Sequence, residues 1–402
     1  MFKLALPLLL TLILVTAPLR QTAIAGQGDS RAINAALTAL QESKAAHALK
    51  LLESILSRKD PPIHALLIAG NAYIHQDAYT KALSLFSKGA ELYPEHAGML
   101  QNKAIAFYYL EQFANAATCF LKAAQLAKLD AQKDAKAKTA AWRQNHYQAA
   151  ACFYKAEKYT KARNAILPIL SDNTPQSFTA TLKLYAHIEL ALENWKEATS
   201  ALQQLIANTP QDAKSWKLLA ETYLRTDALG KAASALQVAY SITAPTASEQ
   251  TRLARIFLQI DAPLLACKTL EKIPSPLTAS QYKLLAIGHE RSGNTAGAIT
   301  ALQKAVSLDN SVKSNMELGK LLYRSCQYQE AIAPLSTAAN QMKKKKGMAY
   351  YLIGQCYMHV ENLEKSKTFF EKALRYKSVK ANAQNALRMI EQLSQTRMNT
   401  KI

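Results

Sequence analysis

Small and aromatic residues recur along this chain at an interval of about 34 residues, and this period constrains the fold more than any other feature. Gly70 is followed by Tyr73, and the same pairing of a small and an aromatic residue returns at Ala104 and Phe107. A period in this range is typical of a solenoid, in which each repeat is a helix pair that cannot bury its apolar face alone. The small residue lets two helices approach closely, and the aromatic residue fills the space beside it. The period therefore predicts an all-α chain of stacked helix pairs.

A second small residue, early in the second helix of each predicted pair, marks the repeats along the chain. The intervals between successive markers are 34, 34, 46, 36, 34, 34, 32, 33 and 35 residues. These intervals define about ten repeats between residues 29 and 380, with one repeat closing early at residues 273–276. The markers are Ala48, Ala82, Ala116, Ala162, Ala198, Ala232, Ala266, Ala298, Ala331 and Ser366.

At these residues the chain resembles the tetratricopeptide repeat (TPR) family, and the resemblance covers nearly all of it. The repeats that carry it best contain Trp216-Leu219-Ala220-Tyr223 and Tyr350-Ile353-Gly354-Tyr357. The resemblance implies a right-handed superhelical solenoid of about ten helix pairs. It also implies that ligands lie on a concave surface formed by positions 2, 5, 9, 12 and 13 of each first helix.

Three further segments complete the expected organisation. The 46-residue interval holds an insertion near residues 130–142 without an apolar stripe. We interpret it as a solvated extension of the neighbouring helices, with a partner-binding arm as the alternative. Residues 381–394 are amphipathic and read as a capping helix that shields the last repeat, followed by a tail at residues 395–402.

Residues 1–25 have the layout of a bacterial secretory signal. A basic start at Lys3 precedes an apolar run over residues 4–19, and Ala23-Ile24-Ala25 fits the small-x-small cleavage rule. The run is short for a membrane span, which needs about 20 apolar residues. We therefore predict cleavage after Ala25 and a periplasmic protein. The alternative is an uncleaved signal that anchors the protein in the inner membrane.

Export would place the five cysteines in an oxidising compartment. No Cys-x-x-Cys pair occurs, and no His ligand lies nearby, so neither a metal site nor a haem site is expected. The repeat frame puts most of these residues at buried positions, which favours free thiols. Single bridges between Cys119 and Cys152 or between Cys326 and Cys356 are the alternatives.

The chain carries a net charge of +20, or +18 once Lys3 and Arg20 are removed with the signal. Such a charge suggests nucleic acid as a partner, but export directs it toward acidic groups of the cell envelope instead. Groove positions are mostly cationic over residues 183–324 and tyrosine-rich over residues 108–154, although a solvated basic face is the competing interpretation. The predicted partner-binding residues are Lys183, His187, Lys217, Arg225, Arg255, Lys283, Arg291, Lys320, Arg324, Tyr108, Tyr109, Tyr147 and Tyr154.

Catalytic signatures are absent from the sequence. The eight histidines form no His-Glu-x-x-His motif, and there is neither a Gly-rich phosphate loop nor a Gly-x-Ser-x-Gly elbow. We therefore expect no enzyme activity, no cofactor and no metal. The Lys–Asn pair with which some TPR proteins clamp a C-terminal carboxylate is also missing, so that activity is not implied.

The sequence favours a periplasmic scaffold that binds an extended or acidic segment of an envelope protein. In its layout of signal and repeats the chain also resembles TPR proteins encoded beside TonB-type energy-transduction systems. A third hypothesis is an accessory role in envelope polysaccharide export or outer-membrane assembly. Contact with a membrane surface and self-association through the end repeats stay open.

Overall fold

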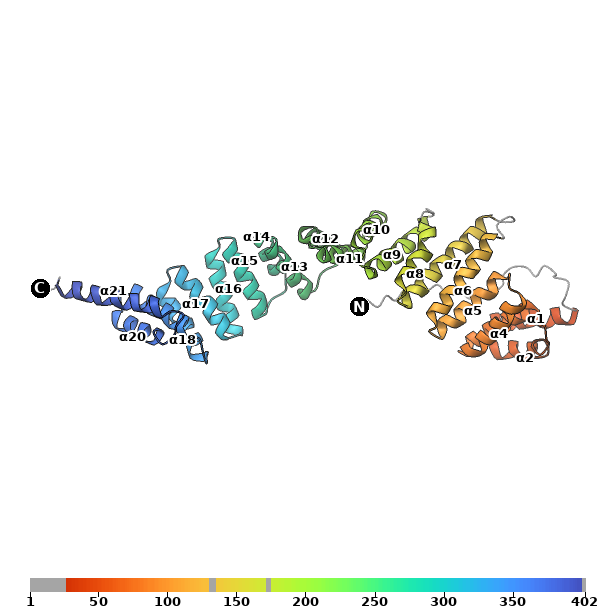
Figure 1. Cartoon of the computed structure of the whole chain (residues 1–402), viewed down its shortest axis with the longest axis horizontal. Helices are drawn as coiled ribbons and strands as arrows, with labels where there is room; N and C mark the ends of the chain where they lie inside the picture. The colour runs from red at the N-terminus through yellow and green to blue at the C-terminus, as the bar shows by residue number, and fades with distance from the viewer. Residues whose placement is uncertain (1–26, 130–134, 171–174, 400–402) are drawn as a thin grey trace. The chain divides into compact units, whose positions relative to one another are not determined.

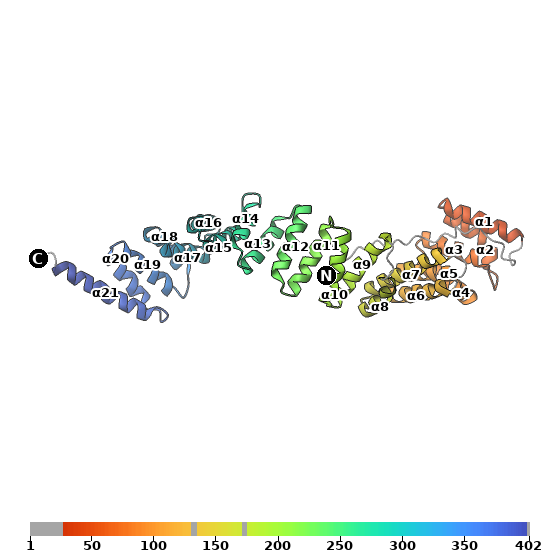
Figure 2. The same ribbon diagram turned by 90° about the horizontal axis from the view of Figure 1, so that it is seen from above.

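A computed structural model describes residues 27–129, 135–170 and 175–399, and over these ranges it contains 21 helices and no strand (Figure 1). The predicted signal at residues 1–25 lies outside the described residues. The chain divides into two compact units, residues 1–226 and 227–402. Within each unit successive helices pack side by side and antiparallel, as both views show (Figures 1 and 2). The prediction of an all-α fold built from helix pairs is confirmed.

The helices alternate between the first and second member of a pair. The first helices are α1 (Gln27–Gln41), α3 (Ile63–His75), α5 (Ala97–Tyr109), α7 (Ala135–Lys155), α9 (Pro175–Ala191), α11 (Ala213–Arg225), α13 (Ala247–Gln259), α15 (Ala279–Arg291), α17 (Val312–Arg324) and α19 (Gly347–His359). The second helices are α2 (Ala45–Leu56), α4 (Tyr79–Leu92), α6 (Phe113–Leu129), α8 (Tyr159–Leu170), α10 (Trp195–Asn208), α12 (Leu229–Ile242), α14 (Pro263–Glu271), α16 (Thr295–Leu308), α18 (Tyr328–Gln341) and α20 (Leu363–Ala373).

The small residues that mark the repeats are buried. All ten marker residues, from Ala48 to Ser366, have no exposed surface. On the opposite helix, Gly354 faces Phe370 so closely that an added Cβ would lie 2.8 Å from the ring. The buried hydroxyl of Ser366 donates to the carbonyl of Gly354 at 2.8 Å, so it is not left without a partner.

A single residue with positive φ turns the chain between the two helices of every pair. These residues have φ between 55° and 80°, a region that non-glycine residues rarely adopt. Seven of the ten are Asp or Glu. The full set is Ser43, Asp77, Glu111, Glu157, Glu193, Asp227, Asp261, Gly293, Cys326 and Glu361.

The insertion and the C-terminal end are largely helical. Helix α6 ends at Leu129 and α7 begins at Ala135, so residues 135–142 of the predicted insertion belong to α7; residues 130–134 lie outside the described part. After α20, helix α21 (Lys380–Asn399) buries Ala383, Ala386 and Ile390 against the end of the array. It extends past residue 394, where the sequence had placed the end of the capping helix.

All five cysteines are free thiols. Cys119, Cys152, Cys267 and Cys356 are buried, whereas Cys326 is exposed in a turn. Burial raises the pKa of the Cys152 thiol to about 12 and that of Cys356 to about 11. These two thiols are therefore protonated at neutral pH and pack as small apolar groups.

Candidate protein-binding surface

One face of the first helix α17 is exposed to solvent, whereas positions 5 and 9 are buried in α3 and α5. We number each first helix so that its last residue is position 13. In α17, Lys313, Lys320 and Arg324 at positions 2, 9 and 13 are exposed, while Leu318 and Leu321 at positions 7 and 10 are buried. Residues three or four apart share a helix face, so the predicted groove positions do form one face of this helix.

Two of the predicted partner-binding cations of unit 2 have no ion pair and no side-chain hydrogen bond among the described residues. They are Arg255 of α13 and Lys320 of α17, both exposed and both at position 9. Between them in the series, Ile287 at position 9 of α15 is 40% exposed. The three side chains belong to consecutive first helices, so position 9 forms a cation–apolar–cation series.

The other predicted cations of unit 2 are engaged with neighbouring repeats. Arg324 pairs with Glu290 of α15 at 2.8 Å. Arg291 donates to the carbonyl of Leu258 near the end of α13 at 2.7 Å, where a helix exposes unsatisfied carbonyl groups. These contacts hold consecutive first helices together and leave less free positive charge than the sequence suggested.

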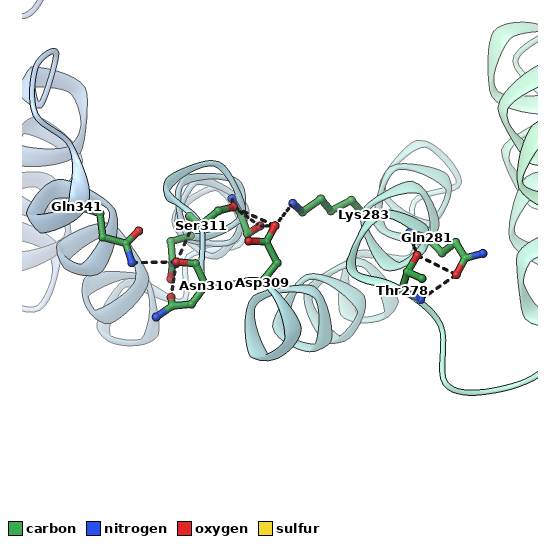
Figure 3. Close-up of polar contacts among 9 residues, drawn as sticks. Thr278, Gln281, Lys283, Asp309, Asn310, Ser311 and Gln341 are labelled. Carbon is green, nitrogen blue, oxygen red and sulfur yellow. Dashed lines mark hydrogen bonds and ion pairs between the residues drawn. The ribbon is translucent and has the colours of Figure 1, made fainter.

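Lys283 also links two repeats (Figure 3). Its ammonium donates to Asp309 at 2.8 Å, and its side chain is only 20% exposed. Asp309 also accepts from the hydroxyl of Ser311 at 3.1 Å, and its pKa is lowered chiefly by the hydrogen bond from Lys283. Lys283, which the sequence predicted as a partner-binding residue, is therefore paired within the repeat array, just before α17 begins.

Neighbouring polar contacts fix the starts of the first helices (Figure 3). Thr278 and Gln281 form a capping box at the start of α15, in which each side chain bonds the backbone N–H of the other. Before α17, the backbone carbonyl of Asn310 accepts from Gln341 at 2.8 Å. The capping box satisfies N–H groups that the start of a helix leaves unpaired.

The predicted cations of unit 1 are similarly constrained. Lys183 lies 3.9 Å from Asp212, the N-cap of α11. Burial, with a smaller contribution from Lys183, lowers the pKa of His187 to about 4, so this imidazole is neutral at pH 7. Arg225 pairs with Glu221 at 3.9 Å along α11, and Lys217 is half-buried and has interaction partners of its own.

The four predicted tyrosines of unit 1 fall into two environments. Tyr147 packs against the apolar core, and burial raises its pKa. Tyr108, Tyr109 and Tyr154 lie at positions 12 or 13, beside the turns to the second helices. Tyr109 is 39% exposed and stacks on Tyr79 of the preceding repeat, with ring centroids 4.8 Å apart and planes 5° apart.

Several residues of this aromatic region were missed by the sequence analysis. Tyr108 lies against Phe113, the first residue of α6, and Tyr154 against Tyr159, the first residue of α8. Lys155 places its ammonium over both rings of the first of these pairs, 4.5 Å and 5.3 Å from their centroids. The sequence did carry a signal for this region. Two aromatic residues lie five positions apart across the turn, and this spacing occurs in two successive repeats.

Other kinds of site find no support in the described part of the chain. No group of three His, Cys, Asp or Glu side chains there is placed to hold a metal ion. None of the helices described is both long enough and apolar enough to cross a membrane.

Sequence models of the tetratricopeptide repeat match residues 33–97, 186–248 and 349–379. A comparison with curated protein sequences finds no match. Among solved structures, the chain is similar to YrrB, described as a TPR protein with an unusual peptide-binding site. The identity is 20% and the TM-score 0.39, over 48% of this chain and 100% of that one. A TPR protein from Parabacteroides merdae is similar at 16% identity and a TM-score of 0.40, over 65% of this chain and 99% of that one.

The three matched segments lie in both units, and the helix pairs between them follow the same period and bury the same marker positions. These matches support the tetratricopeptide repeat family for this chain.

Proposed function

We propose that this protein is a binding scaffold, without catalytic activity of its own, that holds an acidic segment of a partner protein against the first helices of unit 2. The proposal rests on the position-9 series of Arg255, Ile287 and Lys320, in which two unpaired cations flank an exposed apolar side chain. TPR proteins generally mediate protein–protein interaction, and this series supplies the chemistry of a specific contact.

The spacing of the series indicates what the partner segment carries. Packed helices lie about 8–10 Å apart, so two steps from α13 to α17 span roughly 16–20 Å. An extended chain advances about 3.3 Å per residue, which corresponds to about five or six residues. We therefore expect two acidic residues about five or six positions apart, with an apolar residue between them that contacts Ile287.

The test measures binding of a fluorescein-labelled peptide that contains two glutamates six residues apart and a central leucine. Reversing both cations, with Arg255→Glu and Lys320→Glu, should weaken binding at least about tenfold, since each lost contact is worth roughly 1 kcal/mol. Lys268→Glu with Lys272→Glu is the matched control, because it makes the same charge change at exposed positions of α14 and the turn after it.

The control variant should bind within about twofold of the wild type. Equal weakening by both double variants would show that net charge alone drives association. Wild-type affinity in the position-9 variant would overturn the proposal.

We further propose that the protein acts after export to the periplasm. Support comes from the sequence of residues 1–25 alone. When the full chain is expressed, the protein should be recovered in the periplasmic fraction of the cell with Gly26 as its first residue. Recovery in the membrane fraction with Met1 retained would favour the anchored alternative.

A further inference from the structure

Three repeats carry a pair of aromatic rings at the same place, where the first helix ends and the second begins. The two residues of each pair occupy position 12 of the first helix and the first position of the second. The pairs are Tyr108–Phe113, Tyr154–Tyr159 and Tyr323–Tyr328, with centroids 5.3, 5.5 and 5.6 Å apart and ring planes at 63°, 56° and 64°. We call each of these pairs an aromatic corner; the same arrangement of two rings occurs at all three.

Two of these corners are covered by the last residue of the next first helix. At Tyr108–Phe113, Lys155 of α7 places its ammonium over both rings and hydrogen-bonds the hydroxyl of Tyr108. At the corner in unit 2, His359 of α19 stacks on Tyr328, with centroids 4.0 Å apart and planes 6° apart. Position 13 therefore supplies the cover, once with a cation and once with an aromatic ring.

The remaining corner, Tyr154–Tyr159, lacks this cover. The residue of α9 that corresponds to Lys155 is Ala191, which also ends its helix and also lies two residues before a glutamate with positive φ. A methyl group cannot reach across two rings as a lysine side chain does. Both Tyr154 and Tyr159 are half-buried, and no cation–π contact to either ring occurs in the described part of the chain.

The uncovered corner also carries negative charge. Glu157 lies in the turn between the two tyrosines, is exposed, and forms no ion pair with any described residue. Two π faces together with a carboxylate attract an ammonium or guanidinium group. Lys155 lies over the two rings of the Tyr108–Phe113 corner, so a basic side chain fits against an aromatic pair of this geometry.

We propose that the Tyr154–Tyr159 corner, with Glu157, binds one lysine or arginine side chain from a basic segment of a partner protein. This site lies in unit 1 and is chemically opposite to the acidic-segment site proposed for unit 2. It stands or falls independently of that site.

A variant that fills the corner from within provides the sharpest test. Ala191→Lys should place an ammonium over Tyr154 and Tyr159, as Lys155 does one repeat earlier, and so exclude a partner cation. The probe is a tetralysine peptide, acetylated at its N-terminus and amidated at its C-terminus. Its binding is measured at low ionic strength from the NMR signals of the protein's ¹³C-labelled tyrosine rings. We expect its affinity to fall about fivefold to thirtyfold, which corresponds to one cation–π site of about 1–2 kcal/mol.

Ala207→Lys is the matched control, because it adds the same charge at an exposed position of α10. This variant should bind the probe within about twofold of the wild type. Equal affinities of the Ala191→Lys and Ala207→Lys variants would overturn the proposal. A tetraglutamine peptide that shifts the same tyrosine signals as strongly would overturn it too, since binding would then not depend on the positive charge of the peptide.

The reverse variant should create a site. Lys155→Ala uncovers Tyr108 and Phe113, so the probe should shift the signals of Tyr108 as well as those of Tyr154 and Tyr159. An unchanged Tyr108 signal at saturating probe would show that an uncovered corner does not bind cations.

Discussion

His187 illustrates how the surroundings of a single residue decide whether it counts as charged. It occupies position 9 of α9, which in α13 and α17 holds Arg255 and Lys320. Those two side chains are exposed, whereas burial and then Lys183 lower the pKa of His187 from 6.5 to about 4. The same position thus contributes positive charge in unit 2 and a neutral imidazole in unit 1.

This lowered pKa makes stability depend on pH. Between pH 6.5 and pH 4 the unfolded chain binds a proton at His187 that the folded chain does not, so the free energy of unfolding falls as the pH falls. The contribution is fully present above pH 6.5 and should be reduced by about 1–3 kcal/mol below pH 4. Urea unfolding at pH 7.5, 5.5 and 4.5 should show a smaller decrease for His187→Gln than for the wild type. Parallel pH profiles of the two proteins would contradict the assignment.

At the scale of helices, a buried carboxylate joins three consecutive elements of unit 1. Glu189 of α9 has no exposed surface. It accepts from the guanidinium Nε of Arg163 in α8 at 2.8 Å and from the amide of Asn194, just before α10, at 2.7 Å. Because a buried charge is tolerated only when it is paired, this contact fixes how α9 sits between its neighbours.

Replacing Glu189 should therefore weaken unit 1 more than an ordinary surface change. Breaking a fully buried ion pair costs about 3–5 kcal/mol, but Arg163 is 38% exposed and can turn to water. We expect Glu189→Ala to lower the free energy of unfolding by about 1–3 kcal/mol in urea titrations. Glu197→Ala, at an exposed position of α10, should change it by less than about 0.5 kcal/mol. A loss at Glu189 no larger than at Glu197 would mean that the contact does not hold the helices.

The period predicted the helices well because each repeat must bury the same small residue at the same place. Ala198 and Ser366 lie in different sequence contexts, yet both are fully buried at the marker position. The turns also carried a signal that went unused, namely an acidic residue such as Glu111 or Glu157 two residues before the second helix begins. Period alone could not locate the end of α21, since a last helix lacks a following repeat.

For the molecule as a whole, the sequence predicted a binding face but could not tell which of its charges are engaged in contacts between repeats. The contacts that engage Lys283, Arg291 and Arg324 join residues 26 to 34 positions apart. Whether such residues meet depends on how one repeat stacks on the next, and position within a repeat does not report this. The free cations at position 9 and the uncovered tyrosine corner could therefore be recognised only in three dimensions.

The net charge of +20 gives salt two opposite effects on this protein. Self-repulsion of a highly charged chain destabilises its folded state, while exposed ion pairs contribute at most about 1 kcal/mol each. Raising the ionic strength from about 0.01 to 0.1 M shortens the screening distance from about 30 to 10 Å. We expect this to raise the free energy of unfolding by on the order of 1 kcal/mol, and to weaken binding of the acidic peptide.

The four lysines at 343–346, before α19, provide the means to separate these effects, since like charges so close together repel strongly. Replacing all four by glutamine lowers the net charge from +20 to +16. The salt dependence of unfolding, measured by urea titration, should then become shallower, because less repulsion remains to be screened. The affinity of the acidic peptide should change much less than in the Arg255→Glu, Lys320→Glu variant, because those two cations contact it directly. A wild-type chain whose stability falls with added salt would show instead that ion pairs between repeats, such as Arg324–Glu290, outweigh the net repulsion.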